Sequence, residues 1–243
     1  MRLALLHARA ATLELVRLPA FAVPTIGFPS LFFLFFAVPG FGNDWPALAT
    51  AMYAGFAVLG VSFFQFGVGI AVDRATPWER YLRTLPLAPS TRFAGRVISA
   101  LAFGSAAAAA VIVVALVTVA PRLPVAAWAE LALVLLAGSV PFALLGIALG
   151  YLASPRGALP IANVAYLGLS YGGGLWTGPA ALPESVERLS VALPTRAYAD
   201  VLAAVSLDGG PPARAWLVLI AYSLGAGWLA AWAYRRDEGQ RYR

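Results

Sequence analysis

The sequence predicts an all-α integral membrane protein with six transmembrane helices, and three observations lead to that prediction. Hydrophobic residues make up 61% of the 243-residue chain and charged residues only 12%, a composition far too apolar for a soluble domain. Six windows without ionisable side chains are each long enough to cross the hydrocarbon core, which takes about 20 helical residues. The chain contains no lysine, and most of its arginines lie on one side of these windows.

The six windows give the order of the predicted spans. They cover residues 18–43, 45–72, 97–121, 131–155, 157–183 and 215–234. Asp44 lies in a turn between the first two windows, and proline-containing turns separate the third from the fourth and the fourth from the fifth. An even number of spans places both termini on the same side of the membrane.

The arginines orient these spans. On the side of both termini lie Arg2, Arg9, Arg17, Arg74, Arg80, Arg83, Arg92, Arg96, Arg156, Arg235, Arg236, Arg241 and Arg243, whereas Arg122, Arg188, Arg196 and Arg214 lie on the opposite side. Because arginine-rich loops stay in the cytoplasm, the termini are predicted to be cytoplasmic. This distribution explains the net charge of +6 better than nucleic-acid binding does, so no nucleic-acid partner is predicted.

The segment before the first window, residues 1–18, is predicted to form an interfacial helix. Leu6 and Leu13 lie on its apolar side, and Arg9 and Arg17 are among its polar positions. A cleaved signal peptide is the competing interpretation, but the apolar run that follows exceeds the core of about 7 to 15 residues that is typical of such peptides.

The longest polar interruption, residues 73–96, contains a short helix with well-defined ends. Thr76 and Glu79 have the spacing of a capping box, Pro77 suits the first helical position and Pro86 stops the helix, so residues 77–85 are predicted to be helical. Its apolar face carries Trp78, Tyr81, Leu82 and Leu85, and its polar face carries Glu79, Arg80 and Arg83. Such a helix either lies on the lipid surface or docks into a groove on another protein.

A second unusual stretch, residues 182–212, lies between the fifth and sixth windows. Its charged residues, including Glu184, Arg188 and Asp200, prevent it from crossing lipid, yet it is too apolar for a free loop. Two short helices broken at Pro194 fit both facts. They either dip into the outer half of the bundle as a re-entrant hairpin or lie on the outer leaflet, and composition favours neither.

The windows offer little catalytic chemistry. No Asp, Glu, His or Arg lies inside them, which disfavours proton-coupled transport. The absence of cysteine and lysine excludes thiolate metal sites and a P-loop lysine. We therefore predict no catalytic residues, no metal and no cofactor bound by this chain.

The polar residues within the windows have two interpretations. They line a path for an amphipathic or apolar substrate, or they hydrogen-bond between helices. These residues are Ser62, Gln65, Asn163, Tyr166, Ser170, Tyr171 and Thr177. Three consecutive glycines at 172–174, followed by Trp176, are expected to loosen or kink the fifth span.

Two runs of sequence resemble the permeases of ABC-2 type transporters, of the type V exporter class. The first is ERYLRTLPLAPSTRFAGR at 79–96, which resembles their cytoplasmic coupling region. The second, at 161–202, contains GGLW, LP, LS and LPT in that order and resembles their fifth span with the re-entrant hairpin that follows. Together with the six windows and the N-terminal helix, the resemblance covers nearly the whole chain.

This resemblance implies a single permease domain, residues 1–243, that forms the membrane half of an ATP-driven exporter in a prokaryotic inner membrane. Two permeases, identical or homologous, would assemble with two ATP-binding subunits, which bind ATP and Mg. The helix 77–85 would be the coupling helix, contacting the ATPase through Trp78, Glu79, Arg80, Tyr81, Leu82, Arg83 and Leu85. The translocation path or outer gate would include Gln65, Asn163, Tyr166, Ser170, Tyr171, Gly173, Trp176 and Pro194.

The expected substrate is a hydrophobic or amphipathic drug, antibiotic or lipid-like molecule, exported from the cytoplasm or the inner leaflet. The chain would hydrolyse nothing by itself. Two other functions fit the residues: a membrane anchor or scaffold whose cytoplasmic helix recruits a partner, and an ATP-independent carrier or membrane enzyme.

Overall fold

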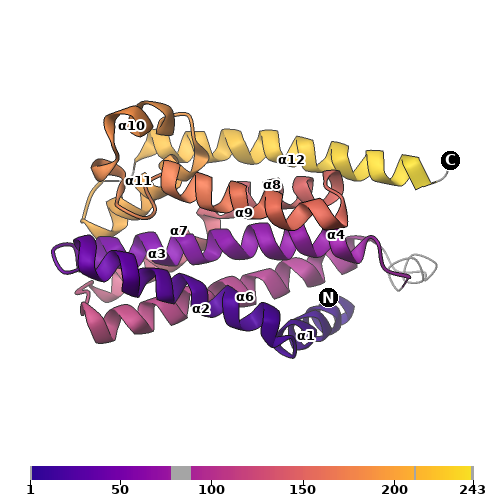
Figure 1. The fold of residues 1–243 in the computed structure, drawn as a ribbon, viewed down its shortest axis with the longest axis horizontal. Helices are drawn as coiled ribbons and strands as arrows, with labels where there is room; N and C mark the ends of the chain where they lie inside the picture. The colour runs from indigo at the N-terminus through magenta and orange to yellow at the C-terminus, as the bar shows by residue number, and fades with distance from the viewer. Residues whose placement is uncertain (1, 78–88, 211, 242–243) are drawn as a thin grey trace.

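A computed structural model describes residues 2–77, 89–210 and 212–241, and every regular element in these ranges is a helix (Figure 1). In chain order the elements are α1 (Arg2–Val16), α2 (Pro19–Phe32), η1 (Phe33–Gly42), α3 (Pro46–Val61), η2 (Ser62–Val68), α4 (Gly69–Asp73), α6 (Pro89–Thr118), α7 (Val125–Gly138), α8 (Val140–Leu152), α9 (Pro155–Gly172), η3 (Pro179–Ala181), α10 (Glu184–Ser190), α11 (Pro194–Ser206) and α12 (Ala213–Arg241). The elements η1 and η2 are π-helical, and η3 is a short 3-10 helix.

Five helical stretches in the described ranges are long and apolar enough to cross a membrane. They are Ala22–Gly42, Pro46–Asp73, Ala94–Thr118, Val125–Leu152 and Ala213–Asp237. Three of them join consecutive elements: α2 with η1, α3 with η2 and α4, and α7 with α8. These five stretches correspond to the first four predicted windows and the sixth.

The fifth predicted window, residues 157–183, differs from the structure. α9 has 18 residues, ends at Gly172 and is not among the five candidate spans. The chain then turns through Gly174 and Gly178, whose φ angles of +83° and +85° lie in the left-handed region that glycine adopts without strain. The glycine-rich run therefore ends this helix instead of kinking it.

α9 nonetheless connects the two ends of the bundle. It begins directly after α8, contacts α4 as well as α10 and α11, and is followed by a turn in which the Trp176 carbonyl accepts a hydrogen bond from the Tyr53 hydroxyl in the middle of α3 (3.2 Å). Eighteen helical residues extend about 27 Å, close to the thickness of a hydrocarbon core.

α3 and η2 form the centre of the bundle, and 78% of the apolar window in their stretch is buried. Elements α6, α8, α9 and α11 pack around them. α8 packs closely against η2 at Gly146 and Gly150: a Cβ added at Gly146 would lie 2.3 Å from the main-chain oxygen of Ser62. A Cβ added at Gly168 of α9 would instead meet nothing within 4 Å.

The chain between α9 and α12 forms two unlike helices separated by a break before Pro194. On α11, Thr195, Tyr198 and Leu202 are fully buried, and the helix packs against α3, α7 and α12. The Tyr198 hydroxyl donates a hydrogen bond to the Leu135 carbonyl of α7 (3.1 Å). On α10, by contrast, Leu189 is 74% exposed. One helix of the pair lies inside the bundle and the other covers its end.

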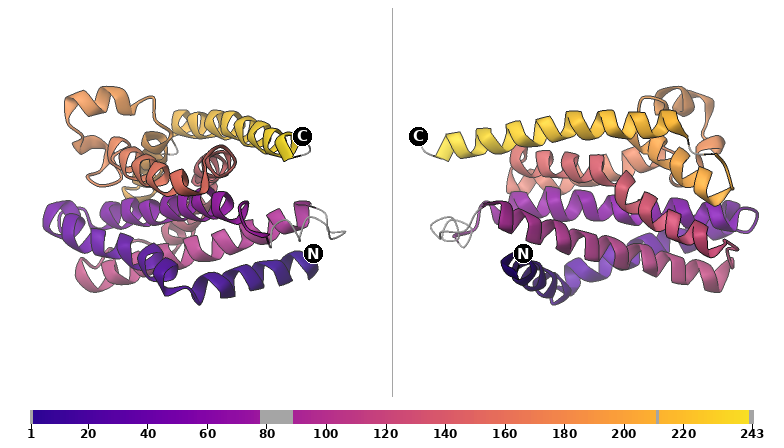
Figure 2. Two further views of the ribbon diagram at one scale, coloured as in Figure 1. Left: turned by 45° about the vertical axis from the view of Figure 1, so that its right-hand side comes forward. Right: turned by 180° about the vertical axis from the view of Figure 1, so that it is seen from behind.

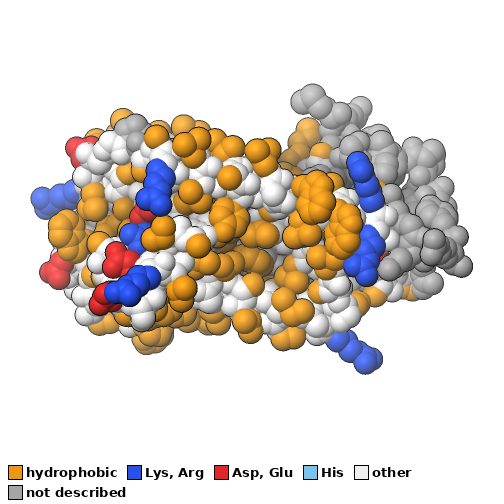
Figure 3. All heavy atoms as spheres, turned by 90° about the horizontal axis from the view of Figure 1, so that it is seen from above, with side chains coloured by type: hydrophobic (Ala, Val, Ile, Leu, Met, Phe, Trp, Pro, Cys, Tyr) orange, Lys and Arg blue, Asp and Glu red, His pale blue; other side chains and the backbone are white. Residues whose placement is uncertain are grey.

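The two ends of the bundle carry different elements. α1, α4 and the C-terminal part of α12 lie at one end, and α10 and α11 lie at the other (Figures 1 and 2). On the face shown in Figure 3, charged side chains gather at the two ends, and the band between them is hydrophobic or uncharged. The apolar helices and this band indicate a multi-pass membrane protein.

Candidate functional site

The predicted coupling residues lie outside the described part of the chain. Trp78, Glu79, Arg80, Tyr81, Leu82, Arg83 and Leu85 all fall within residues 78–88. The described residues on either side are the end of α4 with its following turn, where the Thr76 hydroxyl donates to the Asp73 carbonyl (2.7 Å), and the start of α6. The polar segment therefore connects two neighbouring helices at the end of the bundle that also carries α1.

The residues predicted to form a path or gate lie in several parts of the bundle. Tyr166, Trp176 and their neighbours lie where α2, η1, α3 and α9 meet, and Gln65 lies elsewhere, between η2 and α6. The fold therefore does not bring all of the predicted residues to one place.

Tyr166 and Trp176 belong to an aromatic cluster, which we define as Phe32, Phe36, Tyr53, Phe56, Tyr166 and Trp176. Phe56 stacks on Tyr166 with ring centroids 4.6 Å apart and an angle of 11° between the ring planes. Trp176 meets Phe32 edge-on at 5.5 Å and stacks on Phe36 at 6.3 Å. Phe56 and Tyr166 are buried, whereas Phe36 is 53% exposed. The aromatic cluster thus extends from the core to the surface of the bundle.

Trp176 also presents a polar group that the chain does not satisfy. Its indole Nε1 is buried and has no hydrogen-bond partner among the described residues. Since buried donors nearly always find an acceptor, this N–H is suited to an acceptor supplied by water or by a bound molecule. The exposed Tyr171, at 5.8 Å between ring centroids, lies beside it.

Gly173 and Pro194 lie where the end of α9 meets the start of α11. A Cβ added at Gly173 would lie 2.4 Å from the Thr195 Cβ and 2.6 Å from its main-chain carbon. Only glycine allows the two backbones to approach this closely. Pro194 is the first residue of α11 and is buried at the same contact.

Asn163 and Ser170 use their hydrogen-bonding groups within α9. The Asn163 amide donates to the Leu159 carbonyl (3.2 Å) and the Ser170 hydroxyl to the Tyr166 carbonyl (2.6 Å). Both contacts join a residue to the fourth residue before it, as is common for such side chains in apolar helices. These two donors point along their own helix and not toward the aromatic cluster.

Gln65 connects the core to the N-terminal helix. Its amide Nε2 donates to the Ser99 hydroxyl of α6 (3.0 Å), which also accepts from the Thr12 hydroxyl of α1 (3.1 Å). The Gln65 Oε1 atom is buried and accepts no hydrogen bond from the described residues. Gln65 thus contributes to the attachment of α1 to the bundle.

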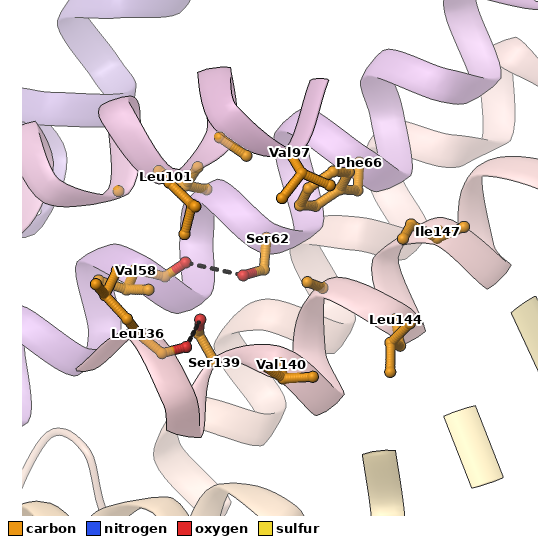
Figure 4. Close-up of a pocket in the computed structure, with 14 residues that line it drawn as sticks. Val58, Ser62, Phe66, Val97, Leu101, Leu136, Ser139, Val140, Leu144 and Ile147 are labelled. Atoms are coloured by element: carbon orange, nitrogen blue, oxygen red, sulfur yellow. Dashed lines mark hydrogen bonds between the residues drawn. The ribbon is translucent and has the colours of Figure 1, made fainter. Parts of the chain in front are cut away.

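A pocket that sequence reasoning missed lies between α3 with η2, α6, and α7 with α8 (Figure 4). Its volume is about 190 Å³. Its only hydroxyls belong to Ser62 and Ser139, and each donates to a carbonyl of its own helix, Val58 at 3.1 Å and Leu136 at 2.8 Å. The lining residues are Val58, Val61, Ser62, Phe66, Val97, Ala100, Leu101, Gly104, Leu136, Ser139, Val140, Ala143, Leu144 and Ile147.

This apolar pocket opens at the surface of the bundle, because its outer residues Leu101, Leu136 and Val140 are 37% to 45% exposed. The junction of α7 and α8 at Ser139 forms one wall. The sequence signal is weak: Ser139 and Pro141 interrupt an otherwise apolar run, but nothing in the sequence says that α6 lies opposite them. Within the described ranges, no group of three His, Cys, Asp or Glu side chains could hold a metal ion.

Comparison with known proteins supports a relationship to transport permeases. The chain is similar to a protein of Bacillus subtilis (strain 168) that bears the provisional name transport permease YvfS. The two are 24% identical over 194 residues, which cover 80% of this chain and 79% of the relative. No protein-family model matches the sequence.

Proposed function

We propose that this chain is the membrane-spanning permease subunit of an ATP-driven ABC-2 type exporter. The observation that carries the proposal is the similarity to a transport permease along 80% of the chain, in a protein whose five apolar helices suit a bilayer. α4 and α6, the described helices on either side of residues 78–88, face each other through the Asp73–Arg96 ion pair, and we assign the polar segment between them as the contact for a separate ATPase.

The proposed substrate is hydrophobic or amphipathic: a drug, an antibiotic or a lipid-like molecule. The walls of the apolar pocket contain no ionisable side chain, and the pocket opens on the apolar surface of the bundle. The aromatic cluster adds flat apolar surfaces and one unpaired donor, the Trp176 indole N–H. Ligand sites of this kind bind mainly through apolar contact and are oriented by a few polar groups.

In the proposed assembly two permeases, identical or homologous, pair with two ATP-binding subunits. ATP and Mg²⁺ belong to those subunits, because this chain has no lysine with which to build a P-loop. α9 supplies the sixth crossing, both termini are cytoplasmic, and α10 with α11 forms the re-entrant hairpin on the outer side of a prokaryotic inner membrane. α1 lies at the inner membrane surface.

The first test is to purify the tagged protein from its native membranes in mild detergent, identify what accompanies it and measure ATP hydrolysis. We expect an equimolar subunit with a P-loop lysine and a complex that hydrolyses ATP. A chain that elutes alone and inert after mild crosslinking would argue for the anchor or the ATP-independent carrier.

The same complex tests the coupling helix. In the proposed complex, Arg80 and Arg83 contact an acidic surface of the ATPase. Replacing both with Glu would place negative charges against that surface, so we expect transport to fall by roughly tenfold or more. The matched control reverses Arg235 and Arg236, two exposed residues in the C-terminal part of α12, with the same change in charge and no expected loss. Equal transport in the two double variants, both folded and expressed, would refute a coupling role for residues 77–85.

A further inference from the structure

Arg74 is the first residue after α4, where the chain leaves the bundle. Its guanidinium reaches two other helices. Nη1 donates to the main-chain oxygens of Gly150 (2.6 Å) and Tyr151 (2.8 Å) at the end of α8, and Nη2 forms an ion pair with Asp237 of α12. The Arg74 side chain is 18% exposed and the Asp237 side chain 6%.

Each of these contacts matches a need of the partner helix. The last carbonyls of α8 have no partner within their helix and carry the negative end of its dipole, so a cation that donates to two of them is well placed. The planar guanidinium of arginine holds several N–H donors in a fixed arrangement, so Nη1 can donate to the carbonyls while Nη2 faces the carboxylate. The guanidinium also lies over the Tyr151 ring at 5.5 Å, and that ring meets Tyr234 of α12 at 5.3 Å.

The preceding residue adds a fourth helix. Asp73 forms an ion pair with Arg96 of α6. Two adjacent residues thus bind the exit of the chain to α6, α8 and α12. The other described ion pairs, Arg188 with Glu184 and Arg196 with Asp200, join residues four apart within one helix. Pairs of that local kind stabilise little.

We propose that Arg74 is a positioning residue. It fixes the end of α4, from which the polar segment 75–88 continues, to α8 and α12, so that a displacement of the segment moves these two helices as well. α8 contributes Val140, Ala143, Leu144 and Ile147 to the apolar pocket, so the contact links the end of the bundle to the pocket wall. The inference rests on the proposed function only in naming what displaces the segment, a bound ATPase.

The position of the end of α4 relative to α12 can be measured without any ATPase. Because the chain contains no cysteine, the exposed positions 75 and 235 can be changed to cysteine and spin-labelled as the only pair within one copy of the chain. In liposomes we expect a narrow distance distribution for the otherwise unchanged protein. It should become broad and shifted in Arg74→Gln and in Asp237→Asn, the second variant serving if the first does not fold.

Two further variants test whether the loss of any ion pair broadens the distribution, and whether opposite charges alone are enough to keep it narrow. Glu184→Gln removes a carboxylate from an exposed pair, with side chains 77% and 79% exposed, and should leave the distribution narrow. The exchange Arg74→Asp with Asp237→Arg restores opposite charges but places a carboxylate near the carbonyls of α8, so the distribution should stay broad. A narrow distribution in the exchange variant, or in Arg74→Gln, would overturn the inference.

The transmission step is tested in the ATPase complex. Asp237→Asn should lower the amount of substrate moved per ATP hydrolysed by roughly fivefold or more while hydrolysis continues. An unchanged ratio together with a broad distribution would show that Arg74 only stabilises the fold, and would reject transmission. If even the wild-type complex does not transport substrate when it hydrolyses ATP, the proposed function fails. The distance measurement still decides whether Arg74 positions the end of α4.

Discussion

At the scale of single residues, some polar side chains hydrogen-bond to neighbouring helices and others hydrogen-bond only within their own helix. Asn163 and Ser170 hydrogen-bond within α9, whereas the Tyr53 hydroxyl reaches the Trp176 carbonyl from α3. Gly173 also serves a contact between helices, since its missing side chain is what lets α9 touch α11. Its importance is therefore steric.

Gly173→Ala should destabilise the protein. The Gly173 backbone is right-handed helical, with φ of −85° and ψ of −7°, so alanine is compatible with its conformation and the cost comes from the added methyl group. That methyl would lie 2.6 Å from the main-chain carbon of Thr195, which cannot move as a side chain can. We expect a loss of about 1 to 3 kcal/mol, seen as a lower melting temperature in detergent.

Gly168→Ala is the matched control, because a Cβ there meets nothing within 4 Å and the residue lies in the same helix. Alanine favours helix over glycine, so this variant should melt at the same temperature or higher. Equal melting temperatures for the two variants would mean that α9 and α11 are not in direct contact.

At the scale of elements, the sequence predicts the apolar helices well and their partners poorly. α3 is apolar on every side, so no face of it can be identified as the one that meets Tyr166 or Leu202. The end of α9 was also hidden, because Leu175 and Trp176 continue the apolar run beyond the glycines. Periodicity reveals the buried face of a helix that has two different faces, and α3 does not have them.

The same limit applies to the candidate site. Tyr166 and Trp176 could be predicted because they are polar or aromatic residues near a glycine run, but their partners Phe32 and Phe56 resemble any other apolar residue of a span. The sequence shows that Arg74 and Asp237 each lie just after a predicted membrane-spanning window. It does not show their pairing, since 163 residues separate them in the sequence and only the packing of α4, α8 and α12 brings them together.

The burial of α11 gives a prediction for this element. Single cysteines at four positions that cover a little more than half of its circumference should resist a membrane-impermeant maleimide, because Ala197, Ala199, Val201 and Leu202 are at most 5% exposed. Cysteines at Leu189 and Val191, which are 74% and 51% exposed, should react. A helix lying flat on the outer leaflet would expose one side to water, so labelling at any of the four positions would favour that arrangement.

At the scale of the whole molecule, the number of crossings decides where every loop lies. Five candidate spans would place the two termini on opposite sides of the membrane, whereas both ends of the chain lie at one end of the bundle (Figure 2). The two observations agree if α9 also crosses. Its 18 residues extend about 27 Å, enough to do so with little thinning of the bilayer.

Single cysteines in exposed loops test this topology. With six crossings, cysteines at Asp44 and Asp208 should react with an impermeant reagent in intact cells, and those at Arg156 and Arg235 only after the cells are permeabilised. The decisive comparison is between Arg156 and Asp208, which flank α9 and the hairpin that follows it. If both react from the same side, α9 does not cross the membrane and the hairpin is not on the outer side. The arrangement with six crossings proposed for the permease would then be wrong.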